Sequence, residues 1–464
     1  MHDKYMKNMV FILLNLTIFS FAGSALAAPH YVMPTNGAAE SPFETWAKAA
    51  TNIQDAVNVA TNGETVWVSN GTYYCQGVYT SIYSYWGNII TNTAMVMITN
   101  SITVQGVNGY SNTIVDGNYP LWTTAVFHVS SDSAILSGLT ITNGFATTNL
   151  LNAGGVRTAG VGIYFKGSLV TNCLITGNIL SNTIGGQSFH VGPAICVDSG
   201  TVSHCIIRGN KAIGSLVYGS GLFANQGGTA AKPIIIKNCD VSYNQSDTSF
   251  SPLRLFYCGS VTAIYCNVHD NNNAGIDISG GGSVVDSCTI SNNSIGLYFV
   301  TESSSTARNC LISSNSTYGV KFAYNCKNSK IENCMVVNNA NGVFFDSSPG
   351  YWFVTLNCII YYNTTANWIH GGTNMSYTNC CTYPMPTNVP GISIGAGNIT
   401  NAPVFVNTNS GNYRLSTDSP CVNTGINQNW MTNRADFDGN PRIRYGTVDM
   451  GAYEVIYNGT IYKF

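Results

Sequence analysis

The sequence predicts an all-β fold, a single-stranded right-handed parallel β-helix, on three observations. First, a nine-residue motif with a central Cys returns at intervals of 22 to 34 residues between Cys173 and Cys380. Second, the copies are rich in Ile, Val, Thr and Asn, which are typical of short strands and turns. Third, no copy contains the ten or more residues of helical periodicity that a helical repeat requires. Right-handed coiling follows the general hand of parallel crossovers.

Each copy of the motif, such as "IENCMVVNN" at residues 331–339, has a Cys two residues before a β-branched residue and five before an Asn. Alternation along a strand directs the Cys and the branched residue inward. Stacked rungs about 4.8 Å apart bring equivalent positions into columns, so we expect a column of buried thiols and a ladder of corner amides. The Cys positions are Cys173, Cys205, Cys239, Cys266, Cys288, Cys310, Cys334, Cys358 and a degenerate Cys380; the Asn positions are Asn178, Asn210, Asn244, Asn271, Asn293, Asn315, Asn339 and Asn363. Six cysteines lie outside this frame, with no predicted pairing: Cys75, Cys196, Cys258, Cys326, Cys381 and Cys421.

The chain divides into four predicted segments. Residues 1–27 are expected to be a signal peptide, because two lysines precede an apolar run and "ALA" offers a cleavage site. Residues 28–64 contain a capping helix, residues 65–400 form a β-helix of about twelve rungs, and residues 401–464 form a closing segment. Both ends need caps, since an exposed end rung would promote aggregation.

The capping helix is predicted from Ile53, Ala56, Val57 and Ala60, which fall on one helical face. No later segment reaches the ~20 apolar residues of a membrane span. We therefore expect bacterial export, a secreted or cell-surface location, no transmembrane segment after signal removal, and a monomer.

The low charge of the chain excludes several functions. Lys and Arg total 19 against 21 Asp and Glu, and no basic cluster is present, so nucleic acid is not an expected partner. Gly-rich phosphate loops, Cys-x-x-Cys zinc patterns and nucleophile elbows are also absent from the sequence.

The repeated frame, with its helix-then-strand start "ATNIQDAVNVATNGETVWVS", resembles the pectin-lyase-like superfamily of right-handed parallel β-helix proteins over nearly all of the mature chain. That superfamily contains lyases, hydrolases, esterases, adhesins and tailspikes, so the resemblance implies the fold more than the activity. It also implies an extracellular acidic polysaccharide as partner. The polygalacturonase signatures of paired carboxylates are absent, which disfavours hydrolysis.

The segment "DFDGNPRIRYGTVDMGAYE", residues 436–454, resembles the closing motif of bacterial secreted β-helix proteins with a "choice-of-anchor" C-terminus. Its spacing does not match an EF-hand loop. We expect a turn-forming last rung with an Arg–carboxylate pair, and a bound cation is the alternative. The matching positions are Asp436, Asp438, Gly439, Arg442, Asp449, Gly451, Ala452 and Glu454.

A first set of candidate site residues lies on the second strand of each repeat, which follows a Gly or a similar breaker. Alternation predicts that one column of this strand faces outward. Four of its residues, Arg254, Asp277, Tyr298 and Lys321, would form a continuous stripe about 15 Å long. The full predicted column is Tyr164, Cys196, Phe223, Arg254, Asp277, Tyr298, Lys321 and Phe344.

A second set lies on the Cys-bearing strand, where Arg208, Asp240 and His269 occupy outward positions of three successive rungs. His204 and Tyr265 stand just before their Cys residues. We expect Arg208, Asp240 and His269 to lie within one patch. Cross-rung ion pairs are also common as solvated surface decoration, which is the structural alternative for every one of these residues.

The leading functional hypothesis is β-elimination on a uronate-containing polysaccharide. A lyase needs a base that removes the proton next to the carboxylate and a group that neutralises that carboxylate. Lys321 with Arg254, or Arg208 with His269, are the candidate catalytic pairs. Asp240 or Asp277 would hold Ca²⁺, and the candidate substrate-binding residues are Tyr298, Asp277, Tyr164 and Phe344. The alternative is a non-catalytic glycan-binding or adhesion protein.

Overall fold

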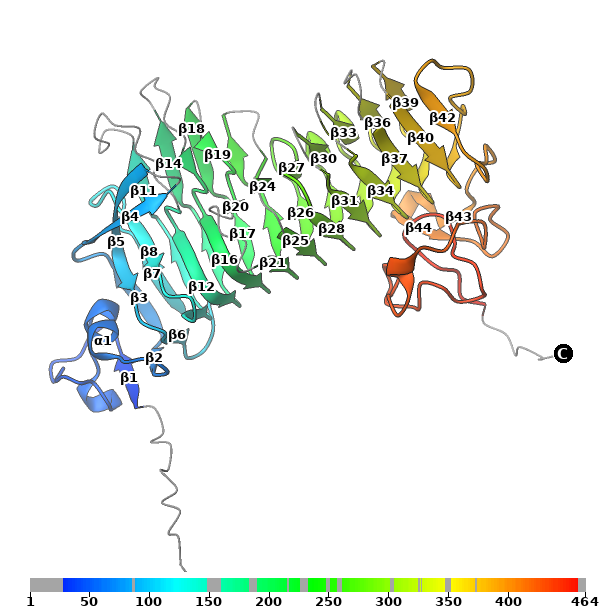
Figure 1. The fold of residues 1–464 in the computed structure, drawn as a ribbon. Coiled ribbons are helices and arrows are strands. Elements are labelled where there is room, and N and C mark those ends of the chain that lie inside the picture. Colours follow the sequence, from blue (N-terminus) through cyan, green and yellow to red (C-terminus); the bar gives the residue numbers. More distant parts are fainter. Residues whose placement is uncertain are drawn as a thin grey trace, which may run out of the picture.

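The protein is a right-handed parallel β-helix, which the computed structural model describes over thirteen stretches (Figure 1). The predicted signal peptide, residues 1–27, and Cys258 lie outside the described residues. The described residues are 28–85, 88–147, 160–182, 190–214, 217–225, 233–247, 251–256, 261–300, 304–323, 326, 328–346, 352–371 and 374–457.

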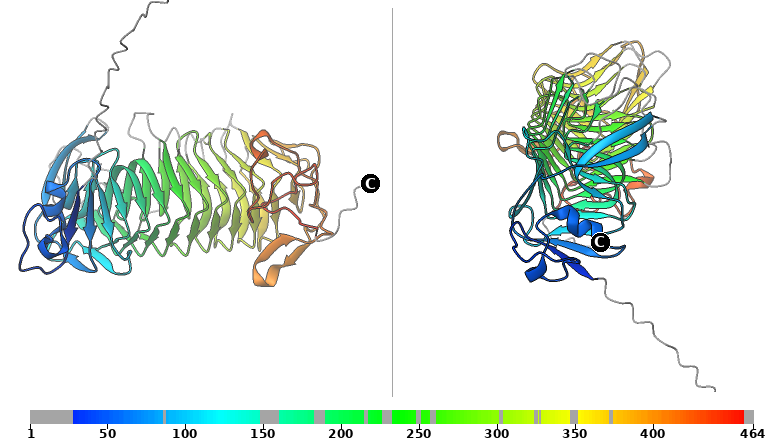
Figure 2. Two further views of the ribbon diagram at one scale, coloured as in Figure 1. Left: turned by 90° about the horizontal axis from the view of Figure 1, so that it is seen from below. Right: turned by 90° about the vertical axis from the view of Figure 1, so that its left-hand side faces the viewer.

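Most strands belong to two long sheets, of 24 and of 12 strands (Figures 1 and 2). The 24-stranded sheet contains β1 (Pro29–Val32), β2 (Thr65–Val68), β4 (Tyr79–Tyr85), β5 (Asn88–Ile98), β6 (Thr103–Gly106), β8 (Ala125–Val129), β9 (Ile135–Ser137), β12 (Ile163–Thr171), β16 (Ile195–Ser203), β20 (Leu222–Asn225), β21 (Ile234–Lys237), β24 (Leu253–Phe256), β25 (Val261–Ile264), β27 (Ile276–Ser279), β28 (Val284–Asp286), β30 (Ile295–Phe299), β31 (Thr306–Arg308), β33 (Tyr318–Phe322), β34 (Lys330–Glu332), β36 (Asn341–Phe345), β37 (Trp352–Leu356), β39 (Ala366–His370), β40 (Asn374–Thr378) and β42 (Ile392–Ile394). The 12-stranded sheet contains β3 (Gly71–Tyr74), β7 (Thr113–Asp116), β10 (Thr140–Thr142), β13 (Leu174–Thr176), β17 (Ile206–Arg208), β22 (Asp240–Ser242), β26 (Asn267–His269), β29 (Thr289–Ser291), β32 (Leu311–Ser313), β35 (Met335–Val337), β38 (Ile359–Tyr361) and β41 (Cys381–Thr382).

Smaller elements complete the described fold. They are a four-stranded sheet of β11 (Phe145–Thr147), β14 (Ile179–Asn182), β18 (Lys211–Gly214) and β23 (Gln245–Ser246), the pair β15 (His190–Val191) and β19 (Val217–Tyr218), the pair β43 (Phe405–Asn407) and β44 (Asn412–Leu415), the helix α1 (Ile53–Val59), and the 3-10 turns Trp46–Lys48, Thr408–Ser410 and Asn429–Met431.

The 24-stranded sheet supplies two of the three faces of the coil, because β12 and β16 each run through both faces and later rungs divide the same path into two strands. The first face contains the starts of β12 and β16 together with β8, β20, β24, β27, β30, β33, β36 and β39. The second face contains the ends of β12 and β16 together with β9, β21, β25, β28, β31, β34, β37 and β40. The third face is the 12-stranded sheet. Sequence reasoning aligned only two strands per rung. The additional strand is the short segment before each Cys, such as β34 before Cys334.

The predicted Asn ladder is confirmed. The side-chain amide of each ladder Asn donates a hydrogen bond to the side-chain oxygen of the Asn in the next rung. For example, Asn315 Nδ2 lies 2.9 Å from Asn339 Oδ1. That oxygen also accepts the backbone N–H of Asn315 at 3.0 Å, so one side chain satisfies two donors of the preceding rung. The same pattern runs from Asn178 to Asn363. The ladder thiols are buried, as expected for core residues.

The N-terminal helix caps the coil as predicted, with Ile53, Ala56, Val57 and Ala60 buried. Its Gln54 is also buried and completes the cap by mimicking a neighbouring strand. Met97 N–H donates to Gln54 Oε1 at 2.6 Å, while Gln54 Nε2 donates to Met97 O at 3.1 Å. These bonds satisfy backbone groups of β5 that no other described strand covers.

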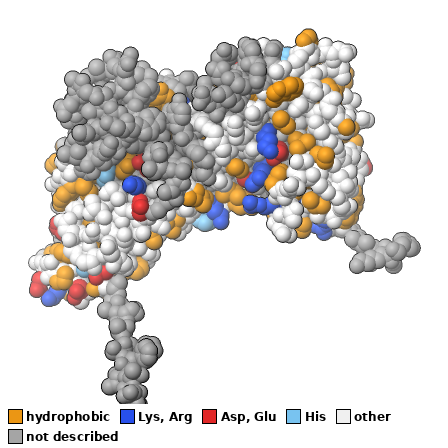
Figure 3. Space-filling model, in the orientation of Figure 1, with side chains coloured by type: hydrophobic (Ala, Val, Ile, Leu, Met, Phe, Trp, Pro, Cys, Tyr) orange, Lys and Arg blue, Asp and Glu red, His pale blue; other side chains and the backbone are white. Residues whose placement is uncertain are grey.

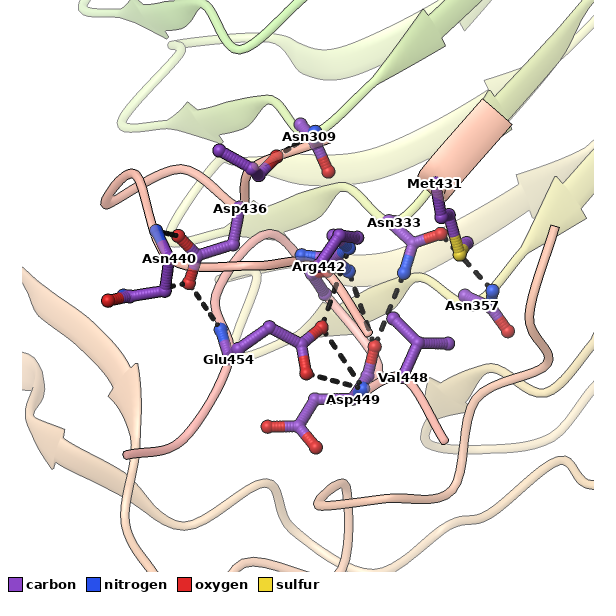
Figure 4. A network of polar contacts seen from close by, with 12 residues as sticks. Asn309, Asn333, Asn357, Met431, Asp436, Asn440, Arg442, Val448, Asp449 and Glu454 are labelled. Atoms are coloured by element: carbon purple, nitrogen blue, oxygen red, sulfur yellow. Dashed lines mark hydrogen bonds and ion pairs between the residues drawn. The ribbon is translucent and has the colours of Figure 1, made fainter. Parts of the chain in front are cut away.

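The closing segment does not extend the coil; it packs on the outside of the third face beside the last rungs (orange to red in Figures 1 and 2). Its buried Tyr413, Leu415 and Met450 form a second core with Met335 and Ile359 of the sheet. The predicted Arg–carboxylate pair is present in this segment. Buried Arg442 places Nε 3.5 Å from Glu454 Oε1 (Figure 4).

A row of asparagines, each directly before a ladder Cys, holds the closing segment in place. Their φ angles lie near 50°, a left-handed conformation that Asn tolerates well. Their Nδ2 groups donate to carbonyls of the closing segment. Asn333 donates to Asp449 (Figure 4). The other bonds run from Asn309 to Ala435, from Asn357 to Ile426 and from Asn379 to Thr424.

Replacing Asn357 by glycine is expected to loosen the closing segment without disturbing the left-handed turn. The substitution removes the amide that pairs with both N–H and C=O of Ile426 at 2.8 and 2.9 Å. Limited proteolysis should cleave N357G in residues 401–457 at least tenfold faster than wild type. Two hydrogen bonds to the closing segment, of about 1 kcal/mol each, are lost, together with the bond from Asn357 Nδ2 to Asn333 Oδ1. Exposed Asn172 has the same backbone conformation, so N172G is the matched control with no expected change. Equal cleavage rates would contradict this role.

Candidate functional site

The candidate stripe of the first face is one continuous column, as predicted. Strand pairing aligns Arg254 with Asp277, Asp277 with Tyr298, and Tyr298 with Lys321. In both directions the column continues beyond these residues, and it reads Met97, His128, Tyr164, Cys196, Phe223, Arg254, Asp277, Tyr298, Lys321, Phe344 and Ile369.

The expectation that this whole column faces solvent is wrong for its first part. Tyr164, Arg254 and Asp277 are only 3%, 4% and 2% exposed. Val191 of β15 and Tyr218 of β19 pack over the column against Tyr164, Cys196 and Phe223. These covering strands lie outside the repeat, so a second layer hides side chains that do point away from the main core.

Arg254 and Asp277 form a buried ion pair rather than an open anion site. Arg254 Nη1 lies 3.6 Å from Asp277 Oδ2, and the guanidinium stacks 4.5 Å from the centre of the Tyr218 ring. Burial raises the pKa of Asp277, and the nearby charge of Arg254 partly offsets that rise. Both charges are buried, so neither is placed to neutralise a substrate carboxylate.

The second part of the column forms a half-buried site around Lys321. Its Nζ lies 5.1 Å from the ring centre of Tyr298, 5.6 Å from that of Phe344 and 5.9 Å from that of Tyr318. Burial, followed by the charges of Asp277, Cys326 and Asp346, raises the pKa of Tyr298, so its hydroxyl stays protonated. Among the described residues, no carboxylate forms an ion pair with Lys321. We call Tyr298, Tyr318, Lys321 and Phe344 the lysine–aromatic cluster.

Charged side chains are sparse on the face of the molecule drawn in Figure 3, where most atoms are hydrophobic or uncharged polar. Lys166, Lys211 and Lys237 likewise form no ion pair within the described residues, so Lys321 is distinguished by the three aromatic rings around its ammonium group. Each such cation–ring contact contributes about 0.5–2 kcal/mol.

The second candidate patch lies on the third face, and the structure brings two of its three predicted members together. His269 Nε2 lies 2.9 Å from Asp240 Oδ2, and His269 Nδ1 lies 2.6 Å from Asp270 Oδ2. Arg208 is exposed and pairs in register with Ser242, one rung before His269. Within the described part of the chain no ion pair joins Arg208 to Asp240.

The two carboxylates control the charge of His269. Burial alone would lower the pKa of the imidazole, but the hydrogen bonds and charges of Asp270 and Asp240 outweigh burial and raise it. The bond from His269 in turn lowers the pKa of Asp270. Because the imidazole pKa is higher in the folded chain, its stabilising contribution is complete below the unfolded value of about 6.5 and disappears as the pH rises through the folded value.

A third titratable cluster on the first face had no sequence signal. Tyr164 OH donates to Asp198 Oδ2 at 2.6 Å, and the ring of buried His128 stacks on Tyr164 with centres 4.6 Å apart. Burial raises the pKa of Asp198 to about 7, against the effects of Tyr164 and exposed Lys166. Asp198 lies at the irregularity between Val197 and Ser199, outside the aligned column, so the repeat gave no signal for it.

The two alternative calcium ligands, Asp240 and Asp277, lie on different faces of the coil. One oxygen of each is already engaged, by His269 and by Arg254 respectively. The described residues contain no group of three or more His, Cys, Asp or Glu side chains placed to hold a metal ion. In the closing segment Asp436 accepts from the N–H groups of Asp438, Asn440 and Glu454 (Figure 4).

Comparisons with known proteins agree with the coil described above. Residues 220–382 match the family model "Right handed beta helix region". No curated protein sequence matches the chain. Within the described residues no helix is long and apolar enough to cross a membrane.

Several solved structures have a similar course of the chain. Pectate lyase Pel9A is 14% identical, with 93% of this chain and 97% of that chain covered and a TM-score of 0.49. The A-module of the Azotobacter vinelandii mannuronan C-5 epimerase AlgE4 is 12% identical, with 74% of this chain and 89% of that chain covered and a TM-score of 0.42. A rhamnogalacturonan lyase is 11% identical, with 76% of this chain and 87% of that chain covered and a TM-score of 0.42. At such identities the similarity concerns the fold alone, and the chain is a right-handed parallel β-helix, of which residues 220–382 match the family model.

Proposed function

We propose that the protein is exported and binds a uronate-containing polysaccharide on the first face of its coil, at the lysine–aromatic cluster. The observation that carries this proposal is the half-buried ammonium of Lys321, which has three aromatic rings around it and no carboxylate partner among the described residues. A uronate carboxylate supplies the missing negative charge. The adjacent sugar rings present C–H groups to the aromatic faces.

Polymer binding suits this geometry better than β-elimination at the same place. A lyase centre built on Lys321 needs a second cation near the substrate carboxylate. Arg254, the predicted neutraliser, is buried and paired with Asp277. Among the described residues, the cluster therefore has a group that holds an acidic sugar but no second cation that would activate it.

The test is binding to polygalacturonate and to the same polymer after full methyl esterification, which removes the charges and keeps the sugar rings. Affinity electrophoresis and calorimetry should give binding to the acid form at least tenfold tighter than to the ester. Alginate and chondroitin sulfate extend the panel to other acidic polymers. Equal affinity for acid and ester, or no binding to any acidic polymer, contradicts the proposal.

A second candidate function is β-elimination at the third face, and the contact of His269 with Asp240 and Asp270 favours it. A histidine held between two carboxylates is a stronger base than a free one once it is deprotonated. Exposed Arg208 lies in the same column and would neutralise the uronate carboxylate. The same polymer panel reports this activity through the absorbance of unsaturated sugar ends.

If His269 is the base, kcat/KM should rise with pH through the pKa of His269, because only the neutral imidazole accepts a proton. D270N removes one carboxylate and should move this limb about one pH unit lower. Asn fits the left-handed backbone of Asp270, where φ is 54°. NMR titration of the imidazole checks the same shift without substrate. An unchanged His269 pKa in D270N would contradict the electrostatic account, and a pH-independent rate would exclude His269 as the base.

A further inference from the structure

Two cysteines outside the ladder come together where the closing segment meets the coil. Cys381 belongs to β41, the last strand of the third face, and Cys421 belongs to the closing segment, 40 residues later. Both side chains are fully buried in the second core, together with Met450. The two cysteines share one buried cluster, and the Cys421 side chain, followed by burial, raises the pKa of the Cys381 thiol, as expected for neighbouring sulfurs.

The neighbouring Cys380 has the opposite orientation. Alternation along the strand turns Cys380 into the main core, where its thiol donates to the carbonyls of Thr355 and Thr378 at 3.3 Å each. Cys381 points outward, and its thiol donates to Asn401 O at 3.2 Å. Two consecutive cysteines therefore face two different cores, and only the second faces a thiol from the closing segment.

We propose that Cys381 and Cys421 form a disulfide bond in the exported protein, while the ladder cysteines remain thiols. The bond ties the closing segment covalently to the end of the coil. It is independent of the proposed glycan binding. It also accounts for two of the six cysteines that the repeat does not use.

The bond forms by two exchange steps with a small disulfide such as oxidised glutathione. One protein thiolate attacks a glutathione sulfur, forms a mixed disulfide and releases one glutathione thiolate. The second protein thiolate then attacks the protein sulfur of the mixed disulfide, the Cys381–Cys421 bond forms, and the second glutathione leaves. The protein loses two protons and two electrons, and oxidised glutathione becomes two reduced molecules.

Because both thiols are buried in the folded chain, the exchange can occur only at an early stage of folding. Neither thiol is accessible in the folded chain, so oxidant reaches the pair only before the closing segment has docked. The folded reduced protein should therefore resist oxidised glutathione, whereas protein that refolds in its presence should acquire the bond.

The experiment is to refold the reduced, guanidinium-unfolded mature chain, residues 28–464, in a mixture of reduced and oxidised glutathione. Free thiols are then blocked with a maleimide in denaturant, and the protein is digested with trypsin. Cleavage after Lys330, Arg414 and Arg434 gives a peptide of residues 415–434 whose sole cysteine is Cys421. The expected product is this peptide linked to residues 331–414.

Two variants locate the other partner within residues 331–414, which also contain Cys334, Cys358 and Cys380. C381S should abolish the link, and the matched variant C380S should retain it. Fragmentation of the linked wild-type peptide assigns the partner independently, even if a variant fails to refold. A maleimide-labelled Cys421 in the oxidatively refolded wild type, or a link that persists in C381S, overturns the proposal.

Discussion

Replacing Asn315 by alanine is expected to lower the free energy of unfolding by about 4 kcal/mol. The side chain donates to the carbonyls of Ile290 and Ser313 at 3.2 and 3.1 Å, and its oxygen accepts the backbone N–H of Asn293 at 3.0 Å. Its removal leaves buried backbone groups without partners, at a cost of about 1–3 kcal/mol each. The loss is large because the ladder lies where no water replaces the amide.

Urea unfolding followed by circular dichroism measures this loss, with the wild-type denaturant slope applied to both proteins. Ser316 is exposed on the same rung, so S316A is the matched control and should change stability by less than about 0.5 kcal/mol. A similar midpoint for N315A and S316A would mean that the amide ladder does not stabilise the coil.

Replacing Lys321 by methionine is expected to weaken binding to polygalacturonate about 30-fold, or about 2 kcal/mol. Methionine keeps the apolar stem that packs between Tyr298 and Phe344, so the change removes the charge and little else. The affinity for the methyl-esterified polymer should stay within about twofold of wild type, because the ester has no carboxylate to lose.

Lys237 provides the control, since it is an exposed lysine on the second face of the coil. K237M removes the same charge from the protein and should leave the affinity unchanged. Equal weakening by K237M and K321M would indicate attraction to the overall charge instead of a site. No weakening by K321M would place the glycan elsewhere.

Repetition explains why much of the architecture was predictable. A motif that recurs once per rung fixes strand pairing, so the column from Arg254 to Lys321 and the stacked amides from Asn178 to Asn363 follow from alignment alone. The same alignment placed Asp240 and His269 in one patch, where they form a diagonal contact while the register pairs Asp240 with Asn267. In these cases the position of a residue within the motif determines which residues of the neighbouring rungs it contacts.

Burial was not predictable from the repeat, because the residues that cover the column are not part of it. Val191 and Tyr218 turn the expected open site at Tyr164, Arg254 and Asp277 into an interior layer. A repeat describes which residues point away from the core, but solvent exposure depends on every segment that packs afterwards.

The sequence does contain a signal for the docking of the closing segment, an Asn before the ladder Cys in four successive rungs, but only the structure shows what these Asn residues bind. Asn precedes the ladder Cys at Asn309, Asn333, Asn357 and Asn379, the four rungs that the closing segment covers. In several earlier rungs other residues stand there, including His204 and Tyr265. A left-handed turn explains a preference for Asn, whereas the bonds to the closing segment explain the unbroken run of four.

A crystal structure of the protein with a bound oligogalacturonate tests the proposed site most directly. We expect a sugar carboxylate within 4 Å of Lys321 Nζ and pyranose rings against Tyr298 or Phe344, on the first face of the coil. An oligosaccharide bound over His269 and Arg208 on the third face, with Lys321 free of contact, would contradict the assignment of the lysine–aromatic cluster.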